Sequence, residues 1–258
     1  MSIDSPRRTL VTGASHPLGL ELVRQCLLRG DIVYAACRSP ARATALTDLR
    51  AGFSGLELLE LDPADAACVT DVIPVLQELT DNLDLLVVGP AEPGLRGNYE
   101  SSHMSRAQGA EQLSSLSGTA LMEHYRRHAV APLLLIRTLL PWLTHSDSGR
   151  VLVISPGANS GDGDRPRAAY ATMASAVALR ALMVSLARDL DERNVVVCVG
   201  NADFGSSASS GSFRSRDGHG VDAELPMEEV ARGLLHQAER FPRYRSGEVV
   251  DWTGMQHA

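Results

Sequence analysis

Short apolar runs alternate with amphipathic stretches along most of the chain. The runs are almost continuously apolar, which is typical of strands buried on both faces of a sheet, and the longer stretches between them have the helical period. The pattern predicts strands at about 8–12, 31–37, 56–61, 84–88, 150–155, 195–199 and 248–252. It predicts helices at about 18–29, 40–50, 65–80, 119–143, 169–192 and 227–240.

This alternation predicts an α/β fold of the Rossmann type. Strands separated by helices favour parallel pairing, and right-handed crossovers then lead to a doubly wound sheet of about seven strands with helices on both faces. A chain of 258 residues fits one domain, so we expect residues 1–258 to form a single unit.

Two stretches, about 92–117 and 203–224, are polar, rich in Gly and Ser, and do not follow the alternation. Each comes after a predicted strand, and loops at the carboxyl ends of strands frame the ligand crevice in such sheets. We expect them to be irregular loops that cover a substrate cleft. The alternative is that they are surface loops with little order.

Composition narrows the choice of partners and compartment. The 24 basic and 31 acidic residues give a net charge of −7, which argues against nonspecific nucleic-acid binding. The start of the chain lacks the apolar run of a signal peptide, and we expect no stretch to approach the length of a membrane span. We therefore expect a cytoplasmic protein without a membrane partner. Four widely spaced cysteines are expected to be small buried hydrophobes, namely Cys26, Cys37, Cys68 and Cys198.

A glycine-containing turn, Thr12-Gly13-Ala14-Ser15-His16-Pro17-Leu18-Gly19, joins the first strand to the first helix. The backbone N–H groups of such a turn and of the helix N-terminus can hold a pyrophosphate. Gly13 permits the tight turn, and Gly19 lets the helix approach the strand. Pro17 has no N–H and is expected to weaken the phosphate site. The predicted cofactor-binding residues here are Thr12, Gly13, Ser15, Leu18 and Gly19.

Two further residues follow the next two strands. Arg38 ends the second strand, where the adenosine ribose of a dinucleotide would lie, and an arginine suits a 2′-phosphate. With Arg42 one turn later, it favours NADP over NAD. The alternative is that both are solvated surface arginines. Asp62 follows the third strand and is placed to accept a hydrogen bond from an adenine amino group. Its alternative role is to cap the helical segment that begins near Pro63.

These motifs resemble those of the short-chain dehydrogenase/reductase family over essentially the whole chain. Thr12-Gly13-x-x-x-Pro17-x-Gly19 is similar to the family's TGxxxGxG with its middle glycine replaced. The runs 38–42 and 246–254 are most similar to the C-factor branch. The resemblance implies an NADP(H) cofactor, a small-molecule substrate, and a homodimer or homotetramer formed through the long helices near 119–143 and 169–192.

The resemblance also locates the family's catalytic Asn, Ser, Tyr and Lys. The Asn position falls on His128, the Ser position on Pro156 with Ser155 one residue early, the Tyr position on Tyr170 and the Lys position on Ala174. Only the tyrosine is retained. The family's Asn-Asn-Ala-Gly is replaced by Val88-Gly89-Pro90-Ala91, and its Pro-Gly after the sixth strand by Gly200-Asn201-Ala202.

The missing lysine bears directly on the chemistry. A tyrosine has an ordinary pKa of about 10, and an ammonium about 4 Å away would favour the phenolate by roughly 4 kcal/mol at an effective dielectric constant of about 20. Ala174 supplies no charge, so ordinary ketone reduction is expected to be crippled. The imidazole of His128, which ordinarily titrates near pH 6.5, could exchange protons with Tyr170 instead, or could simply be packed in its helix.

Two other groups of residues give weaker evidence of function. His124 and His128 are four residues apart, a geometry that can bind zinc, but no Glu follows His124 and we expect no metal. Ser155 as a nucleophile would need a base beside it, and no neighbour in the sequence supplies one.

Three functions follow from these observations. The first is redox-neutral acid–base chemistry on a small organic molecule, such as cyclisation, dehydration or isomerisation, with Tyr170 as proton donor or acceptor alongside His128 and Ser155. The second is that of an NADPH-dependent carbonyl oxidoreductase. The third is that of a noncatalytic NADP-binding sensor or partner subunit.

Overall fold

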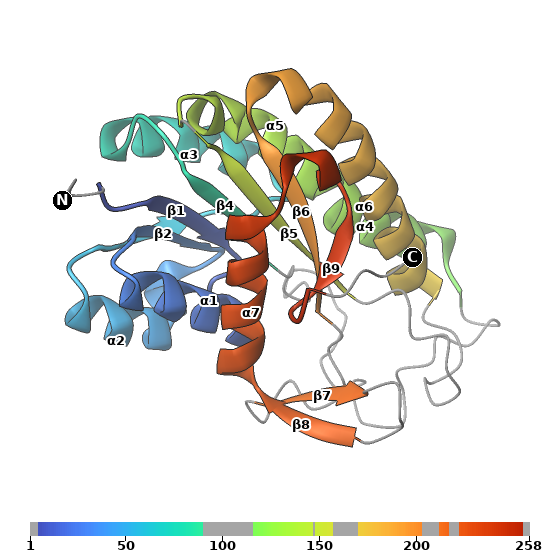
Figure 1. The fold of residues 1–258 in the computed structure, drawn as a ribbon, viewed down its shortest axis with the longest axis horizontal. Helices are drawn as coiled ribbons and strands as arrows, with labels where there is room; N and C mark the ends of the chain where they lie inside the picture. Colours follow the sequence, from blue (N-terminus) through green and yellow to red (C-terminus); the bar gives the residue numbers. More distant parts are fainter. Residues whose placement is uncertain are drawn as a thin grey trace.

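The central element is a seven-stranded sheet in which every pairing is parallel (Figure 1). The computed structural model describes residues 5–89, 116–146, 148–156, 170–202, 212–216 and 222–254. The strand order is β3-β2-β1-β4-β5-β6-β9, so the order reverses between β1 and β4, and the predicted doubly wound sheet is confirmed. The strands are β1 (Arg8–Thr12), β2 (Ile32–Cys37), β3 (Leu56–Glu60), β4 (Leu85–Val88), β5 (Arg150–Pro156), β6 (Val196–Ala202) and β9 (Val249–Asp251).

Helices cover both faces of this sheet (Figure 1). One face carries α1 (Pro17–Leu28), α2 (Thr44–Gly52) and α7 (Met227–Arg240). The other carries α3 (Ala66–Leu79), α5 (Ala131–Thr144) and α6 (Tyr170–Asp189). Short 3₁₀ turns are η1 (Pro40–Arg42), η5 (Asp191–Arg193) and η6 (Arg243–Arg245). The predicted helix at 40–50 is therefore divided between η1 and α2.

The predicted helix at 119–143 is also divided. It consists of α4 (Gly118–Tyr125), a π-helical turn η4 (Arg126–Val130) and α5. Pro132, in the first turn of α5, has no N–H to donate to the carbonyl of His128, which opens the helical hydrogen-bond ladder at this point. Single π-helical turns are frequent at functional sites.

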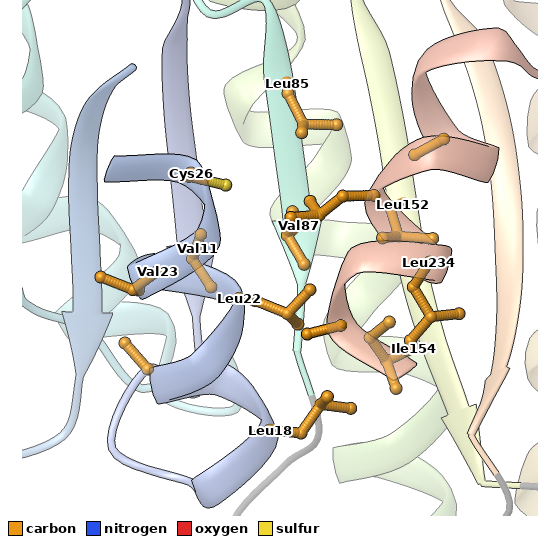
Figure 2. Close-up of a cluster of buried hydrophobic side chains, with 14 of the residues drawn as sticks. Val11, Leu18, Leu22, Val23, Cys26, Leu85, Val87, Leu152, Ile154 and Leu234 are labelled. Atoms are coloured by element: carbon orange, nitrogen blue, oxygen red, sulfur yellow. The ribbon is translucent and has the colours of Figure 1, made fainter. Parts of the chain in front are cut away.

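Each face of the sheet has its own apolar core. Figure 2 shows the first, in which Leu22 of α1 and Leu234 of α7 pack over Val11, Val87 and Leu152 of the strands. The second core lies beneath α3, α5 and α6 and includes Leu10, Leu86, Val153, Leu139 and Leu179. Neighbours along a strand, such as Leu10 and Val11, point to opposite cores. Burying each such side chain contributes about 1.5–3 kcal/mol, so the two cores together hold the layers in place.

Helix α6 is long and apolar enough, by length and composition alone, to cross a membrane. The expectation that no stretch approaches this length is wrong for α6. Its Ala171, Ala176, Leu179, Met183 and Ala187 are buried, and the last three belong to the second core. We therefore describe α6 as a helix that covers the sheet.

The stretch 203–224 was expected to be irregular, and that expectation is wrong in part. β7 (Ser212–Arg216) pairs in antiparallel register with β8 (Asp222–Pro226) to form a separate two-stranded sheet. Few apolar residues mark these strands, so hydrophobic periodicity could not reveal them. The other stretch, 92–117, lies outside the described residues except for its last two positions.

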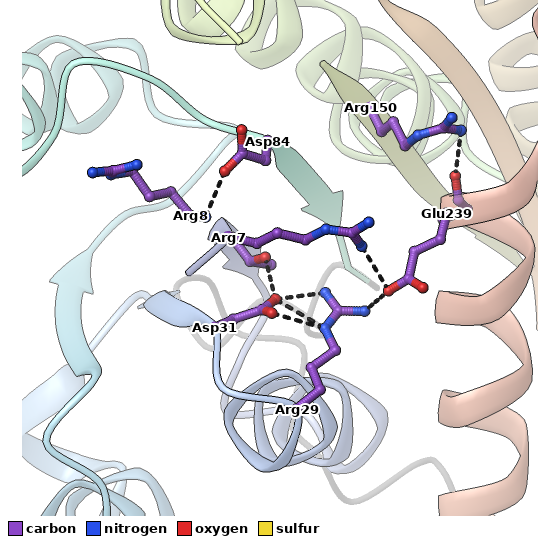
Figure 3. Close-up of polar contacts among 9 residues, drawn as sticks. Arg7, Arg8, Arg29, Asp31, Asp84, Arg150 and Glu239 are labelled. Carbon is purple, nitrogen blue, oxygen red and sulfur yellow. Dashed lines mark hydrogen bonds and ion pairs between the residues drawn. The ribbon is translucent and has the colours of Figure 1, made fainter. Parts of the chain in front are cut away.

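A polar network fixes the amino-terminal edge of the sheet (Figure 3). The buried Asp31 accepts from Thr9 Oγ1 at 2.7 Å and pairs with Arg29, which also pairs with Glu239 of α7. Arg150 donates to the carbonyl oxygens of Ala238 and Phe241 at the end of the same helix. Charged side chains thus join α1, β5 and α7 at this edge. The glycine turn lies at the opposite edge, where the carboxyl ends of the strands meet.

Three of the four cysteines are buried as expected. Burial raises the pKa of the Cys26 and Cys198 thiols to about 12, so both stay protonated near neutral pH. Cys37 is buried as well. Cys68 is an exception, because it is only partly buried and its Sγ accepts a hydrogen bond from the Asp62 N–H at 3.2 Å.

Candidate functional site

A cleft opens at the carboxyl ends of β1, β2, β3 and β4, where the strand order reverses. Crevices at this point are the usual ligand sites of open α/β sheets. The lining residues are Thr12, Gly13, Ser15, Cys37, Arg38, Leu61, Asp62, Pro63, Ala64, Val88, Gly89, Arg127 and Pro132. The structure thus gathers five of the seven predicted cofactor residues around one cleft. Leu18 and Gly19 are not among its lining residues and lie in the first turn of α1.

The mouth of the cleft is a backbone cradle in which side chains do not fit. Gly13 has a φ of 62°, a left-handed conformation that favours glycine. A Cβ on Gly19 would lie 2.1 Å from the Gly13 carbonyl oxygen, and a Cβ on Gly89 would lie 2.1 Å from that of Thr12. The Gly89 N–H donates to Thr12 Oγ1 at 3.2 Å. Close main-chain packing therefore holds α1 against the glycine turn and the end of β4 against the end of β1.

The N-terminus of α1 is partly satisfied by the protein itself. His16 is the N-cap residue, and its Nδ1 accepts a hydrogen bond from the Leu18 N–H at 3.3 Å. Pro17, the next residue, has no N–H. The amide that the sequence suggested for phosphate binding at Leu18 is thus already bonded to His16. We did not predict this cap, although the position of His16 just before a helix-starting proline was a usable signal.

Asp62 is held by contacts on both of its carboxylate oxygens. Oδ1 accepts from the Ala64 N–H at 3.0 Å, while Oδ2 lies 3.8 Å from Nη1 of Arg127. The N-cap of α3 is a different residue, Asp65, whose Oδ1 accepts from the N–H groups of Ala67 and Cys68. The proposed helix-capping role of Asp62 is therefore wrong for α3, and Asp62 instead orders the loop before the helix.

Arg127 is a functional candidate that sequence reasoning missed. It projects from η4 into the cleft, where Arg38 is the other arginine among the lining residues. The sequence predicted one continuous helix at 119–143. The π-helical turn changes the direction in which the following side chains point, so the predicted helix could not show which residue faces the cleft. The cleft accordingly combines two guanidinium groups, which can donate to a phosphate, with the Asp62 carboxylate, which can accept from a donor on a ligand.

His128 lies beside a second imidazole. The rings of His124 and His128 stack with centroids 4.0 Å apart, and His124 Nδ1 lies 3.0 Å from Oγ of the buried Ser175 on α6. Burial, reinforced by His124 and Arg127, lowers the pKa of His128 to about 4. The pKa of His128 thus lies below the ordinary value of an imidazole, and the ring is neutral at physiological pH.

The remaining catalytic candidates lie at the ends of β5 and α6. Tyr170 is the first residue of α6 and is 42% exposed, and Ala174 is exposed one turn later. Ser155 is fully buried near the end of β5, in register with Asn201 of β6. α6 packs against both α4 and η4, so Tyr170 and His128 lie on neighbouring elements.

Asn201 is a second residue that sequence reasoning did not single out as a site residue. It is 4% exposed, and its Oδ1 has no hydrogen-bond partner among the described residues. A Cβ on the preceding Gly200 would meet Leu234 of α7, so Asn201 faces the other side of the sheet, as Ser155 does. A buried amide oxygen without a partner is costly and is therefore a candidate ligand contact.

A doubly wound parallel sheet with a glycine turn at its switch point is the architecture of the Rossmann-type α/β fold. A sequence profile of the family described as short chain dehydrogenase matches residues 7–210, and the chain belongs to this family. No curated protein matches the chain.

Solved structures agree with this fold. The NADPH-bound carbonyl reductase from chicken fatty liver is 20% identical, with 98% of this chain and 99% of that chain covered and a TM-score of 0.75. The carbonyl reductase Sniffer of D. melanogaster is 20% identical, with 98% and 100% covered and a TM-score of 0.74. The RhlG/NADP complex of Pseudomonas aeruginosa is 22% identical, with 96% and 95% covered and a TM-score of 0.75. At these identities the likeness establishes the fold.

Proposed function

We propose that the protein is an NADP(H)-dependent oxidoreductase that acts on a small carbonyl compound or the corresponding alcohol. The observation that carries this proposal is the meeting of Arg38 and Asp62 with the Gly13 turn in one cleft at the switch point. A guanidinium suits a 2′-phosphate, a carboxylate suits the adenine amino group, and the main-chain N–H groups of the turn between β1 and α1 suit a pyrophosphate. The similar chicken fatty liver enzyme is described as an NADPH-bound carbonyl reductase, which supports the same reading.

The cofactor, when bound, supplies the hydride chemistry, and the protein orients the groups and moves the proton. Tyr170 is the residue that we assign as proton donor to the carbonyl oxygen. His128 is unprotonated at physiological pH, since its pKa is about 4, so it has no imidazolium proton to donate and is a weak acceptor. With an exposed alanine at position 174, no ammonium from that position assists Tyr170, and we expect slow turnover.

Redox-neutral proton transfer is the second candidate, and the same Ala174 favours it. A cyclisation, dehydration or isomerisation needs a positioned donor and acceptor and no transferred hydride. Tyr170 as donor and His128 as acceptor lie on neighbouring elements. Because its lowered pKa makes His128 a weak base, we expect such proton transfer to be slow. In this case the cleft would bind the dinucleotide for structure or regulation.

Calorimetry with NADPH and NADH, followed by turnover assays with a panel of ketones and aldehydes, tests the proposal. We expect tighter binding of NADPH and a slow loss of reduced-nicotinamide absorbance with at least one carbonyl compound. Tyr170→Phe should lower that rate by about 10²–10⁴-fold while NADPH binding stays unchanged. Conversion of a substrate with no change in NADPH would favour redox-neutral chemistry, and binding without any turnover would favour a noncatalytic sensor.

A further inference from the structure

The guanidinium of Arg127 is anchored before any ligand arrives. Its Nε donates to Oε1 of Glu123 at 2.7 Å, and its side chain is only 22% exposed. Hydrogen bonds, first from Arg126 and then from Arg127, lower the pKa of Glu123 to about 2. The anchoring carboxylate therefore stays ionised throughout the physiological pH range, and Arg127 is held at the wall of the cleft.

Arg126 and Arg127 share this anchor but reach different parts of the loop after β3. Arg126 donates through Nε to Oε2 of Glu123 at 2.8 Å, and through Nη1 to the main-chain carbonyl of Ala64. Arg127 extends instead toward the carboxylate of Asp62. Of these two arginines, only Arg127 lines the cleft. The pair thus provides a cleft-facing arginine and a matched neighbour that contacts only main chain on the same loop.

The contacts to Asp62 fix its carboxylate and leave it able to accept further hydrogen bonds. The Ala64 N–H binds Oδ1, and Arg127 lies on the side of Oδ2 at 3.8 Å, which is an ion pair and not a tight hydrogen bond. An ionised carboxylate has about four acceptor positions, so free lone pairs remain on Oδ2. The carboxylate is thereby oriented and still available for a donor on a ligand.

We propose that Arg127 is a positioning residue that holds Asp62 in the orientation needed to recognise the amino group of an adenine ring. This inference rests on the proposed dinucleotide function and deepens it. Asp62 accepts from the exocyclic amino group of adenine, whereas hypoxanthine presents an oxygen there that the carboxylate repels. Arg127 therefore determines selectivity between the two bases by acting through Asp62.

The experiment measures Kd by calorimetry for NADPH and for its hypoxanthine counterpart. We expect the wild-type protein to bind NADPH at least about tenfold more tightly than the hypoxanthine form, and Arg127→Met to reduce this ratio to about twofold. Arg126→Met, the matched control, should keep the wild-type ratio. Asp62→Asn should lose the preference by itself, and adding Arg127→Met to it should change the ratio no further.

The ratio separates positioning from general loosening, because a loosened cleft weakens both nucleotides alike. An unchanged ratio in Arg127→Met, or additive effects of Arg127→Met and Asp62→Asn, would overturn the role of Arg127 and leave the dinucleotide site intact. Failure of the wild-type protein to bind NADPH would overturn the cofactor site and this inference together. If Arg127→Met does not fold, Arg127→Lys replaces it in the test. We then expect a ratio of the two Kd values between that of the wild type and that of Asp62→Asn. A full wild-type ratio would exclude the proposal.

Discussion

The two halves of the carboxyl edge of the sheet differ in what they have kept of the family pattern. At the ends of β1, β2 and β3, the glycine turn, Arg38 and Asp62 are all in place around one cleft. At the positions that the resemblance assigns to catalysis, His128 and Ala174 stand where the family has Asn and Lys. Under the proposed function, cofactor binding and proton transfer would depend on separate strand ends, so the residues for one could change while those for the other stay.

The altered half has nevertheless kept a polar interior. Ser155, Ser175 and Asn201 are all at least 96% buried. Burying polar groups costs free energy unless they are satisfied, and apolar residues would have packed there at lower cost. Ser175 lies within hydrogen-bond distance of His124, and Oδ1 of Asn201 is without a partner in the described part of the chain. This half therefore keeps buried polar side chains although two of the family's catalytic residue types are missing from it.

Gly19→Ala should break the binding half most severely. The new Cβ would lie 2.1 Å from the Gly13 carbonyl oxygen, and neither main-chain segment can move away cheaply. We expect a loss of about 3 kcal/mol or more in the free energy of unfolding, measured in urea, together with loss of NADPH binding. Gly52→Ala is the control, because no atom lies within 4 Å of its added Cβ and its stability should change by less than about 1 kcal/mol. A stable Gly19→Ala protein would contradict the cradle.

Ala174→Lys should partly restore the catalytic half. Position 174 is exposed and one helical turn after Tyr170, so a lysine fits without displacing the core and brings an ammonium near the phenol. We expect the rate of NADPH-dependent carbonyl reduction to rise by about tenfold to a hundredfold, with unchanged affinity for NADPH. Ala174→Gln, of similar length without the charge, should not raise the rate. A fall in rate on adding the lysine would favour the redox-neutral reading.

His128→Gln should change the pH dependence of stability. In the wild type, the native-state pKa of about 4 lies below the ordinary 6.5, so the unfolded chain binds the proton more readily between these values. The contribution of His128 to stability is therefore lost as the pH falls through this window, by about 2 kcal/mol between pH 7 and pH 5. Urea unfolding at both pH values should show a smaller decrease for the variant.

The same change at His236, which is exposed on α7, provides the control. His236→Gln should keep the wild-type difference between the two pH values. An equal decrease in the wild type and in His128→Gln would contradict the buried, neutral imidazole.

The fold could be predicted because its signals are local and repeated. Buried parallel strands are apolar throughout, and their order along the chain fixes the doubly wound topology. The places of Arg38 and Asp62 at the cleft could be predicted because a strand end is visible in the sequence, while their roles in cofactor binding stay predictions. The strands β7 and β8 could not be predicted, because they contain few apolar residues.

The residues that were missed depend on contacts between distant segments. The rotation of Arg127 into the cleft follows from the π-helical turn, and the orphan oxygen of Asn201 follows from the packing of its strand. The lowered pKa of His128 likewise follows from burial that no local pattern reveals. The homodimer or homotetramer and the individual roles of the catalytic candidates stay predictions.

His16→Ala should have the smallest effect and should move stability and binding in opposite directions. Loss of the imidazole removes the acceptor for the Leu18 N–H at the start of α1, which costs about 1 kcal/mol in the free energy of unfolding. The same change frees that N–H for a phosphate oxygen, so we expect calorimetry to show NADPH binding a few-fold more tightly. His16→Asn, which supplies another capping side chain, should restore stability and return the affinity toward the wild-type value. Weaker NADPH binding in His16→Ala would mean that the imidazole assists phosphate binding. The idea that His16 competes with a phosphate oxygen for the Leu18 N–H would then be wrong.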